Sequence, residues 1–132
     1  DVVDHQWCDN GPPWQAILLR SAEQALELRP NPAALDGRFV GVIAPHASGS
    51  VVDFEVRAFF PTAHGIGEDP VTGSLNGAVG QWLIGAGRAP KRYTAAQGTA
   101  LGFAGRVHVE MIDAAVWVGG RCTTVLEGTA TL

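Results

Sequence analysis

Alternation of apolar and polar residues predicts strands at several places in the chain. It is clearest over residues 53–60, where apolar residues at 54, 56, 58 and 60 alternate with charged residues at 53, 55 and 57. This period of two, which residues 106–111 repeat, predicts a strand with one buried face and one face in water. Short apolar segments predict further strands at residues 14–19, 40–44, 93–96, 115–118, 122–126 and 129–132. Residues 1–10 show no period, and we expect an irregular lead-in there.

Two short helices are predicted from their capping residues. Ser21 is followed by Gln24, so the serine hydroxyl is expected to cap a helix while the glutamine reaches back to its start. Asn31 precedes Pro32, a pair typical of a helix start, and Gly37 is expected to end this second helical turn.

Residues 71–87 carry no charge and predict a third helix, which is buried. Leu75, Val79 and Leu83 follow helical spacing, and the opposite face is made of small residues instead of polar ones. Ser74 is the expected N-cap of a helix over residues 75–86. Glycines inside this helix are tolerable if the surrounding strands approach it closely. The sequence therefore predicts an α+β fold in which a mostly antiparallel, barrel-like sheet wraps around one central helix.

Length and charge narrow the class of protein. The 132 residues suit one domain over residues 1–132, and the net charge of −4, with Lys91 as the only lysine, argues against nucleic acid or an anionic membrane as partner. The chain has no apolar run of about 18 residues and no signal peptide pattern.

Cys8 and Cys122 could close a long disulfide loop, but two free thiols in a reducing cytoplasm are the favoured interpretation. Met111 is the only methionine, so we expect a processed chain or a piece of a longer one.

The segment before the buried helix holds the candidate chemistry. Gly73, Ser74 and Leu75 present unpaired backbone N–H groups at the helix start, and these groups and the helix dipole favour an anion. Asp69 lies five residues before Ser74 in a loop rich in glycine and proline, where it is a candidate general acid or base. The alternative is structural: Glu68 and Asp69 are solvated loop acids, and Ser74 is only a cap.

Metal and thiol chemistry find little support in the sequence. His5 and Cys8 have the spacing of two metal ligands, but no second pair follows, and we predict no metal site. Neither cysteine has an evident base as partner, so a nucleophilic cysteine is not expected.

Several longer motifs together resemble one enzyme family. They are Glu68-Asp69-Pro70-Val71-Thr72-Gly73-Ser74 with Asn76, and the segments DNGPPW at 9–14, DFEVRAFFP at 53–61, QG at 97–98 and VWVGG at 116–120. In this order they resemble the phenazine-biosynthesis (PhzF-like) isomerases, over residues 9–132. The resemblance implies a diaminopimelate-epimerase-like fold of two similar domains, with the active site in the cleft between them. The match is to the C-terminal half of such a protein.

The resemblance also implies roles for individual residues. Asp69 matches the aspartate that lines the cleft and shuttles protons, and Gly73 and Ser74 match the helix start that holds the substrate carboxylate. Trp14, His64 and Gln97 are possible cleft residues, although a solvated His64 is the favoured interpretation. The characterised chemistry is a cofactor-free isomerisation of a cyclic dihydro-hydroxyanthranilate by proton transfer, which needs no metal or nucleotide.

Two hypotheses about function follow. In the first, the chain is the C-terminal domain of a PhzF-like isomerase that acts on a small carboxylic acid. It then needs an N-terminal domain, in cis or on another chain, because the resemblance places the principal glutamate acid/base and a substrate-holding histidine there. In the second, the chain is a stand-alone module that binds a small carboxylate without catalysis and forms a homodimer. A domain with no function of its own is a third interpretation. The sequence leaves the substrate open.

Overall fold

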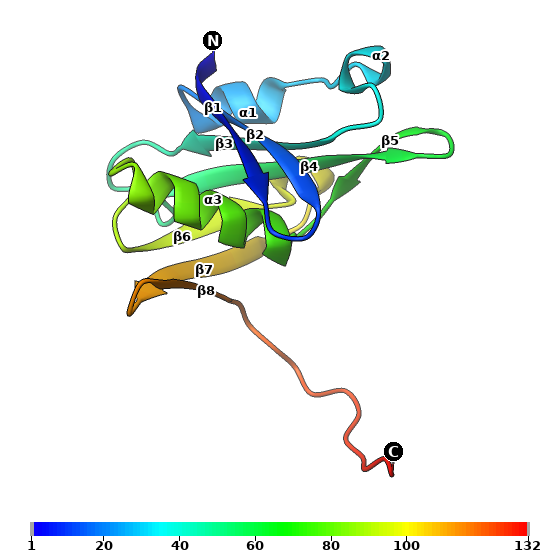
Figure 1. The fold of residues 1–132 in the computed structure, drawn as a ribbon, viewed down its shortest axis with the longest axis vertical. Helices are drawn as coiled ribbons and strands as arrows, with labels where there is room; N and C mark the ends of the chain where they lie inside the picture. Colours follow the sequence, from blue (N-terminus) through cyan, green and yellow to red (C-terminus); the bar gives the residue numbers. More distant parts are fainter. Residues whose placement is uncertain (1, 132) are drawn as a thin grey trace.

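One curled sheet of eight strands carries the fold within residues 2–131, the part of the chain that this computed structural model describes (Figure 1). The strands are β1 (Val2–Asp9), β2 (Pro13–Leu19), β3 (Phe39–Pro45), β4 (Phe54–Thr62), β5 (Gly65–Asp69), β6 (Arg92–Gln97), β7 (Gly105–Ile112) and β8 (Ala115–Gly119). The helices are α1 (Ala22–Glu27), α2 (Pro32–Leu35) and α3 (Gly73–Gly85), with a 3-10 turn η1 (Thr99–Leu101).

The sheet runs in the order β1-β2-β3-β4-β6-β7-β8, and β5 pairs with β4 outside this path. Among the described residues, β2 with β3 and β4 with β6 pair in parallel, and the other five strand pairs are antiparallel. α3 lies inside the curl and contacts β1, β7 and β8 (Figure 1). The α+β class and the sheet wrapped around one central helix are therefore confirmed. The wrapping is open on one side, between the two edge strands β1 and β8.

α3 is buried on the side predicted from its spacing. Leu75, Val79 and Leu83 are at most 1% exposed and belong to the main apolar core. Gly80 allows the close approach expected of the strands, because a Cβ there would lie 2.8 Å from a methyl carbon of Val109. The predicted helix start was wrong. α3 begins at Gly73, and the residue with extended backbone before it is Thr72, which takes the N-cap position in place of Ser74.

α1 covers the opposite face of the sheet over β2, β3 and β4. Ser21 caps α1, accepting a hydrogen bond from the Gln24 N–H, and Asn31 caps α2 in the same way, both as predicted. The prediction that one face of β4 meets water was wrong, because Glu55 is 0% and Arg57 4% exposed. α1 lies over that face and supplies partners to the buried guanidinium.

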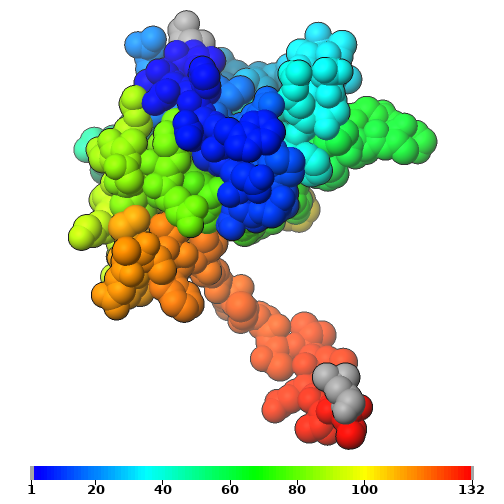
Figure 2. Space-filling model, viewed as in Figure 1, coloured from blue at the N-terminus to red at the C-terminus, as the bar shows by residue number. Residues whose placement is uncertain are grey.

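The two ends of the chain differ from the prediction. β1 is a strand where a lead-in was expected. It escaped detection because Cys8 is its only fully buried residue, as suits an edge strand. The strands predicted at residues 122–126 and 129–132 are absent within residues 121–131, which are exposed and irregular and project from the domain (Figure 2). An apolar pattern forms a strand only beside a neighbour, and this tail lies beside none in the described part. Asp1 and Leu132 lie outside the described residues.

The two cysteines are free thiols: Cys8 is buried in β1, and Cys122 is exposed in the tail. Within residues 2–131, no helix is long and apolar enough to cross a membrane.

Candidate functional site

The N-terminus of α3 presents backbone N–H groups that lack acceptors. The first helical hydrogen bond runs from the Asn76 N–H to the Thr72 carbonyl, at 3.1 Å. The N–H groups of Gly73, Ser74 and Leu75 precede it, where a helix has no internal acceptor for them. Gly73 is exposed and Ser74 partly exposed, whereas Leu75 is fully buried. Gly73 and Ser74 are therefore the residues at which an anion can approach the positive end of the helix.

A groove of about 380 Å³ runs from this helix start along α3. One wall is the turn between β1 and β2, and the other is the edge strand β8. In Figure 2, green atoms of α3 are visible between the blue β1–β2 hairpin and the orange β7–β8 hairpin. The groove thus occupies the open side of the half-barrel. Its lining residues are Asn10, Gly73, Ser74, Gly77, Gln81 and residues 116–118.

The buried Trp14 side chain fixes the Ser74 side chain by a hydrogen bond. The Trp14 indole donates a hydrogen bond to the Ser74 Oγ, at 3.1 Å. Because the indole N–H is only a donor, the hydroxyl oxygen is the acceptor and its own proton is free to be donated elsewhere. Trp14 is 3% exposed and packs edge-on against Phe39. It therefore supports the groove from the core instead of lining it.

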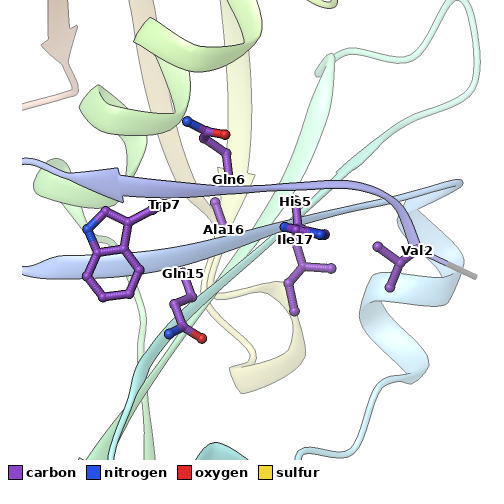
Figure 3. A pocket seen from close by; sticks show the side chains of 7 residues that line it. All are labelled: Val2, His5, Gln6, Trp7, Gln15, Ala16 and Ile17. Carbon is purple, nitrogen blue, oxygen red and sulfur yellow. The ribbon is translucent and has the colours of Figure 1, made fainter.

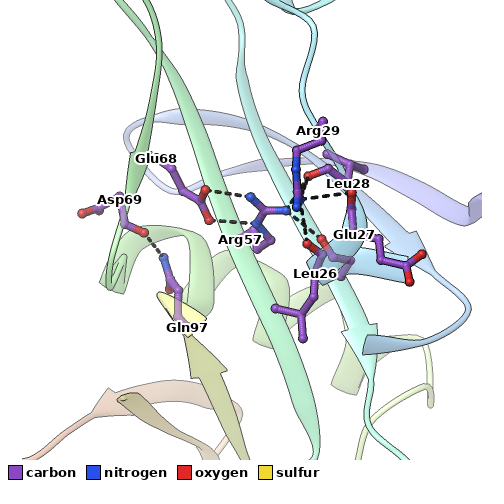
Figure 4. Close-up of polar contacts among 9 residues, drawn as sticks. Leu26, Glu27, Leu28, Arg29, Arg57, Glu68, Asp69 and Gln97 are labelled. Carbon is purple, nitrogen blue, oxygen red and sulfur yellow. Dashed lines mark hydrogen bonds and ion pairs between the residues drawn. The ribbon is translucent and has the colours of Figure 1, made fainter. Parts of the chain in front are cut away.

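Asp69 is the last residue of β5 and stands next to the N-cap of α3. Successive strand residues point to opposite faces, and Glu68 points to the face where it meets Arg57 (Figure 4). The Asp69 carboxylate instead accepts a hydrogen bond on Oδ2 from the Thr72 hydroxyl, at 2.7 Å. Asp69 was expected in a loop. It is placed instead by the pairing of β5 with β4, which fixes the carboxylate beside the helix start.

The buried Gln97 side chain links Asp69 to the start of α3 by hydrogen bonds. Its amide donates to the Asp69 carbonyl at 3.0 Å and to the Thr72 hydroxyl at 2.8 Å, and it accepts from the Thr72 N–H and the Asn76 amide. Gln97 is 0% exposed, so it lies beneath the site and not on the cleft surface. Thr72 and Asn76 were not singled out from the sequence as site residues, although both lie in the motif that carries the family resemblance.

Gly98 allows this arrangement. Its φ is +82°, and a Cβ at this position would lie 2.7 Å from the Pro70 carbonyl oxygen. The Gln97-Gly98 pair therefore brings β6 directly against the Asp69–Thr72 segment.

The remaining candidates lie elsewhere. His64 is exposed in the β4–β5 turn, at the opposite end of β5 from Asp69, so these two side chains are not brought together. His5 is exposed while Cys8 is buried in the same strand. No group of three metal-ligating acids, histidines or cysteines occurs within residues 2–131. Burial raises the pKa of the Cys8 thiol to about 11, which makes it a poor nucleophile.

A second cavity, of about 400 Å³, lies on the β1–β2 hairpin (Figure 3). It is lined by Val2, His5, Gln6, Trp7, Gln15, Ala16 and Ile17. No helix residue is among these lining residues. The groove at α3 is the better candidate for chemistry because it opens at a helix start that can hold an anion, with Asp69 bonded to the N-cap.

Known proteins resemble this chain over most of its length. It is 33% identical over 132 residues to antisense-enhancing sequence 1 of Schizosaccharomyces pombe, covering 91% of this chain and 44% of that protein. It is 39% identical over 104 residues to a protein of Deinococcus radiodurans named an uncharacterized isomerase, covering 69% of this chain and 33% of that protein.

Solved structures share the fold. A phenazine biosynthesis PhzC/PhzF protein from Clostridium difficile superposes with a TM-score of 0.63 at 27% identity, over 90% of this chain and 45% of that one. A PhzF-family protein from Bacillus anthracis gives a TM-score of 0.61 at 18% identity, over 82% and 41%. The chain thus spans less than half of each of these proteins. Residues 2–128 match the family described as phenazine biosynthesis-like protein, PhzC-PhzF. The chain belongs to this family.

Proposed function

We propose that the chain is the C-terminal half of a PhzF-like isomerase, which moves a proton on a small carboxylic acid without a cofactor. The observation that carries this proposal is the Asp69 carboxylate, bonded to the N-cap of a helix whose first N–H groups open into a groove. Family membership and the name of the D. radiodurans relative support an isomerase. The share of the relatives that the chain covers supports a second domain.

The proposed reaction has two parts, which are anchoring of the substrate carboxylate and transfer of a proton. The substrate carboxylate accepts hydrogen bonds from the N–H groups of Gly73 and Ser74 and from the Ser74 hydroxyl. Asp69 takes a proton from a substrate carbon, the C–H electron pair enters the substrate's double-bond system, and a second acid returns a proton at another carbon. One C–H bond breaks and one forms, so no oxidant is needed. The second acid comes from a partner domain, because a proton shuttle needs a group on each side of the substrate and Asp69 supplies only one of them.

We expect the isolated chain to associate through the face that carries the helix start. Trp117 and Val118 on β8, and Val71 and Phe103 beside the β5–α3 connection, expose apolar surface on two sides of it. Such a surface usually finds a partner. Sedimentation at high micromolar concentration should show a dimer, and Trp117→Arg should dissociate it. Trp7→Arg, on a similarly exposed tryptophan of β1, is the matched control. A monomeric wild-type chain contradicts this expectation.

The anion site is tested by titration with benzoate. Ser74→Ala should weaken binding about 10- to 100-fold, because it removes a charge-assisted hydrogen bond of about 1.5–3 kcal/mol. Since Ser74 does not occupy the N-cap position of α3, we expect the accompanying loss of stability to come from the unpaired Trp14 indole.

The same titration is repeated with two variants. Asp69→Asn replaces a carboxylate beside the helix start by a neutral amide of similar shape, and it should tighten benzoate binding about fivefold because repulsion between two anions is lost. Gly73→Val is the steric control, since a Cβ there meets nothing within 4 Å in the folded chain and can only obstruct the ligand. Absence of binding, or binding unchanged in Gly73→Val, contradicts the anion site.

A further inference from the structure

We propose that Gln97 and Thr72 are positioning residues which leave only Oδ1 of Asp69 free to exchange a proton with the substrate. This inference rests on the proposed function, in which Asp69 is the acid/base. It follows from the direction of each hydrogen bond in the buried network beneath the site.

The orientation of the Gln97 amide is fixed by the backbone. The Thr72 N–H can only donate, and it lies 3.0 Å from Gln97 Oε1. The Asp69 carbonyl can only accept, and it lies 3.0 Å from Gln97 Nε2 (Figure 4). A flipped amide would face a donor with a donor and an acceptor with an acceptor. Gln97 is 0% exposed, so water does not offer it other partners.

This orientation decides where the Thr72 hydroxyl proton points. Gln97 Nε2 donates to Thr72 Oγ1 at 2.8 Å, so the hydroxyl oxygen is the acceptor of that bond. The single hydroxyl proton is left for the bond to Asp69 Oδ2, at 2.7 Å. The chain of donors therefore runs in one direction, from the amide through the hydroxyl to the carboxylate. The N-cap threonine makes these two side-chain bonds and none to its own helix.

The consequence for Asp69 is a difference between its two oxygens. Oδ2 is held as an acceptor, and Oδ1 has no hydrogen bond within the described residues. A proton taken from the substrate therefore forms its new O–H bond at Oδ1 while Oδ2 keeps its bond from Thr72. The carboxyl group also loses freedom to rotate, which holds Oδ1 in one position for the transfer.

Few other charges act on Asp69. Glu68 and Arg57 pair with each other on the opposite face of the β4–β5 hairpin. The first turn of α3 carries no acid, β4 places Ala58 across from Asp69, and Gln97 of β6 is uncharged. The groove lining adds no titratable group. The hydrogen bond from the Thr72 hydroxyl is therefore the contact that holds the Asp69 carboxylate in place.

The first test needs only the unliganded chain. NMR should detect the Thr72 hydroxyl proton in slow exchange with water, and Asp69→Asn should shift it upfield because the charge-assisted bond is lost. A hydroxyl proton in fast exchange, or one unmoved by Asp69→Asn, overturns the proposal. This readout is independent of benzoate binding, so it tests the direction of the hydrogen bonds separately from the proposed function.

The second test uses the rate of the chain assembled with the N-terminal domain of a family member. Thr72→Val preserves side-chain shape and removes the hydroxyl. It should lower kcat about tenfold with KM unchanged, because the freed carboxyl no longer holds Oδ1 in one position for the transfer. Thr72→Ser restores the hydroxyl and should restore kcat. A merely structural role for Thr72 predicts weaker stability with kcat of the folded protein retained, and that result overturns the proposal.

Discussion

Arg57→Leu is expected to lower the free energy of unfolding by about 3–5 kcal/mol, a large part of the stability of a domain this size. The Arg57 guanidinium bonds both oxygens of Glu68 at 2.8 Å and the carbonyls of Ala25 and Leu28 at the end of α1. The side chains of Arg57 and Glu68 are 5% and 11% exposed. Removing the cation leaves a buried carboxylate and buried carbonyls without a donor. Urea denaturation followed by circular dichroism measures the loss.

The matched control is Arg92→Leu. Arg92 also pairs with a glutamate on a neighbouring strand, at 2.9 Å, but its side chain is 77% exposed. Its loss should cost less than about 1 kcal/mol. The double replacement of Arg57 and Glu68 by leucine should recover part of the stability, because no charge is left buried alone. Equal losses of unfolding free energy in Arg57→Leu and Arg92→Leu would contradict the inference that burial makes the Arg57–Glu68 pair the more stabilising one.

Under the proposed function, with a dihydro-hydroxyanthranilate as the test substrate, the 132-residue chain alone is expected to react about 10²–10⁴ times more slowly than when assembled with the N-terminal domain of a family member. A proton shuttle needs a donor and an acceptor on two sides of the substrate, and loss of one such group costs about this factor. A continuous assay of substrate absorbance measures both rates.

Asp69→Asn in the assembly is the matched variant, and it should bring the rate back to that of the isolated chain. Full turnover by the isolated chain contradicts the need for a second domain. An assembly without activity, but with benzoate bound at the helix start, supports a binding module instead.

The central helix could be predicted because its signal is local. The spacing of Leu75, Val79 and Leu83 defines one apolar face, and the glycines among them fit only a crowded interior. Its first residue could not be predicted from side-chain preference. Thr72 and Ser74 are both good caps, and the choice between them depends on the hydrogen bonds that Gln97 and Trp14 supply from distant strands.

Burial on the second face of the sheet also depends on distant elements. The alternation at Glu55 and Arg57 is what a strand half in water shows, and nothing in that segment reveals that α1 will cover it. The buried pair with Glu68 forms only because β5 folds back on β4. The charge of Arg57 therefore predicted an exposed side chain, whereas the fold buries it and pairs it with Glu68.

The candidate site, too, could be predicted from the sequence only in part. The motif at residues 68–74 indicated Asp69 and the helix start from sequence alone, and the structure places Asp69 beside the N-cap of α3. Gln97 was singled out as a cleft residue, but a sequence motif does not show depth, and its side chain lies fully buried behind Asp69. The direction of the hydrogen bonds through Thr72 follows only from the three-dimensional arrangement.

Mapping where a small carboxylate binds tests the role of the helix start most directly. The chain labelled with ¹⁵N is titrated with benzoate, and the backbone amide signals of the groove at α3 are compared with those of the cavity on the β1–β2 hairpin. We expect the largest shifts at Gly73 and Ser74, with Gln6 and Gln15 unchanged. Shifts confined to the hairpin cavity, with Gly73 and Ser74 unmoved, would contradict the assignment of the helix start as the carboxylate site.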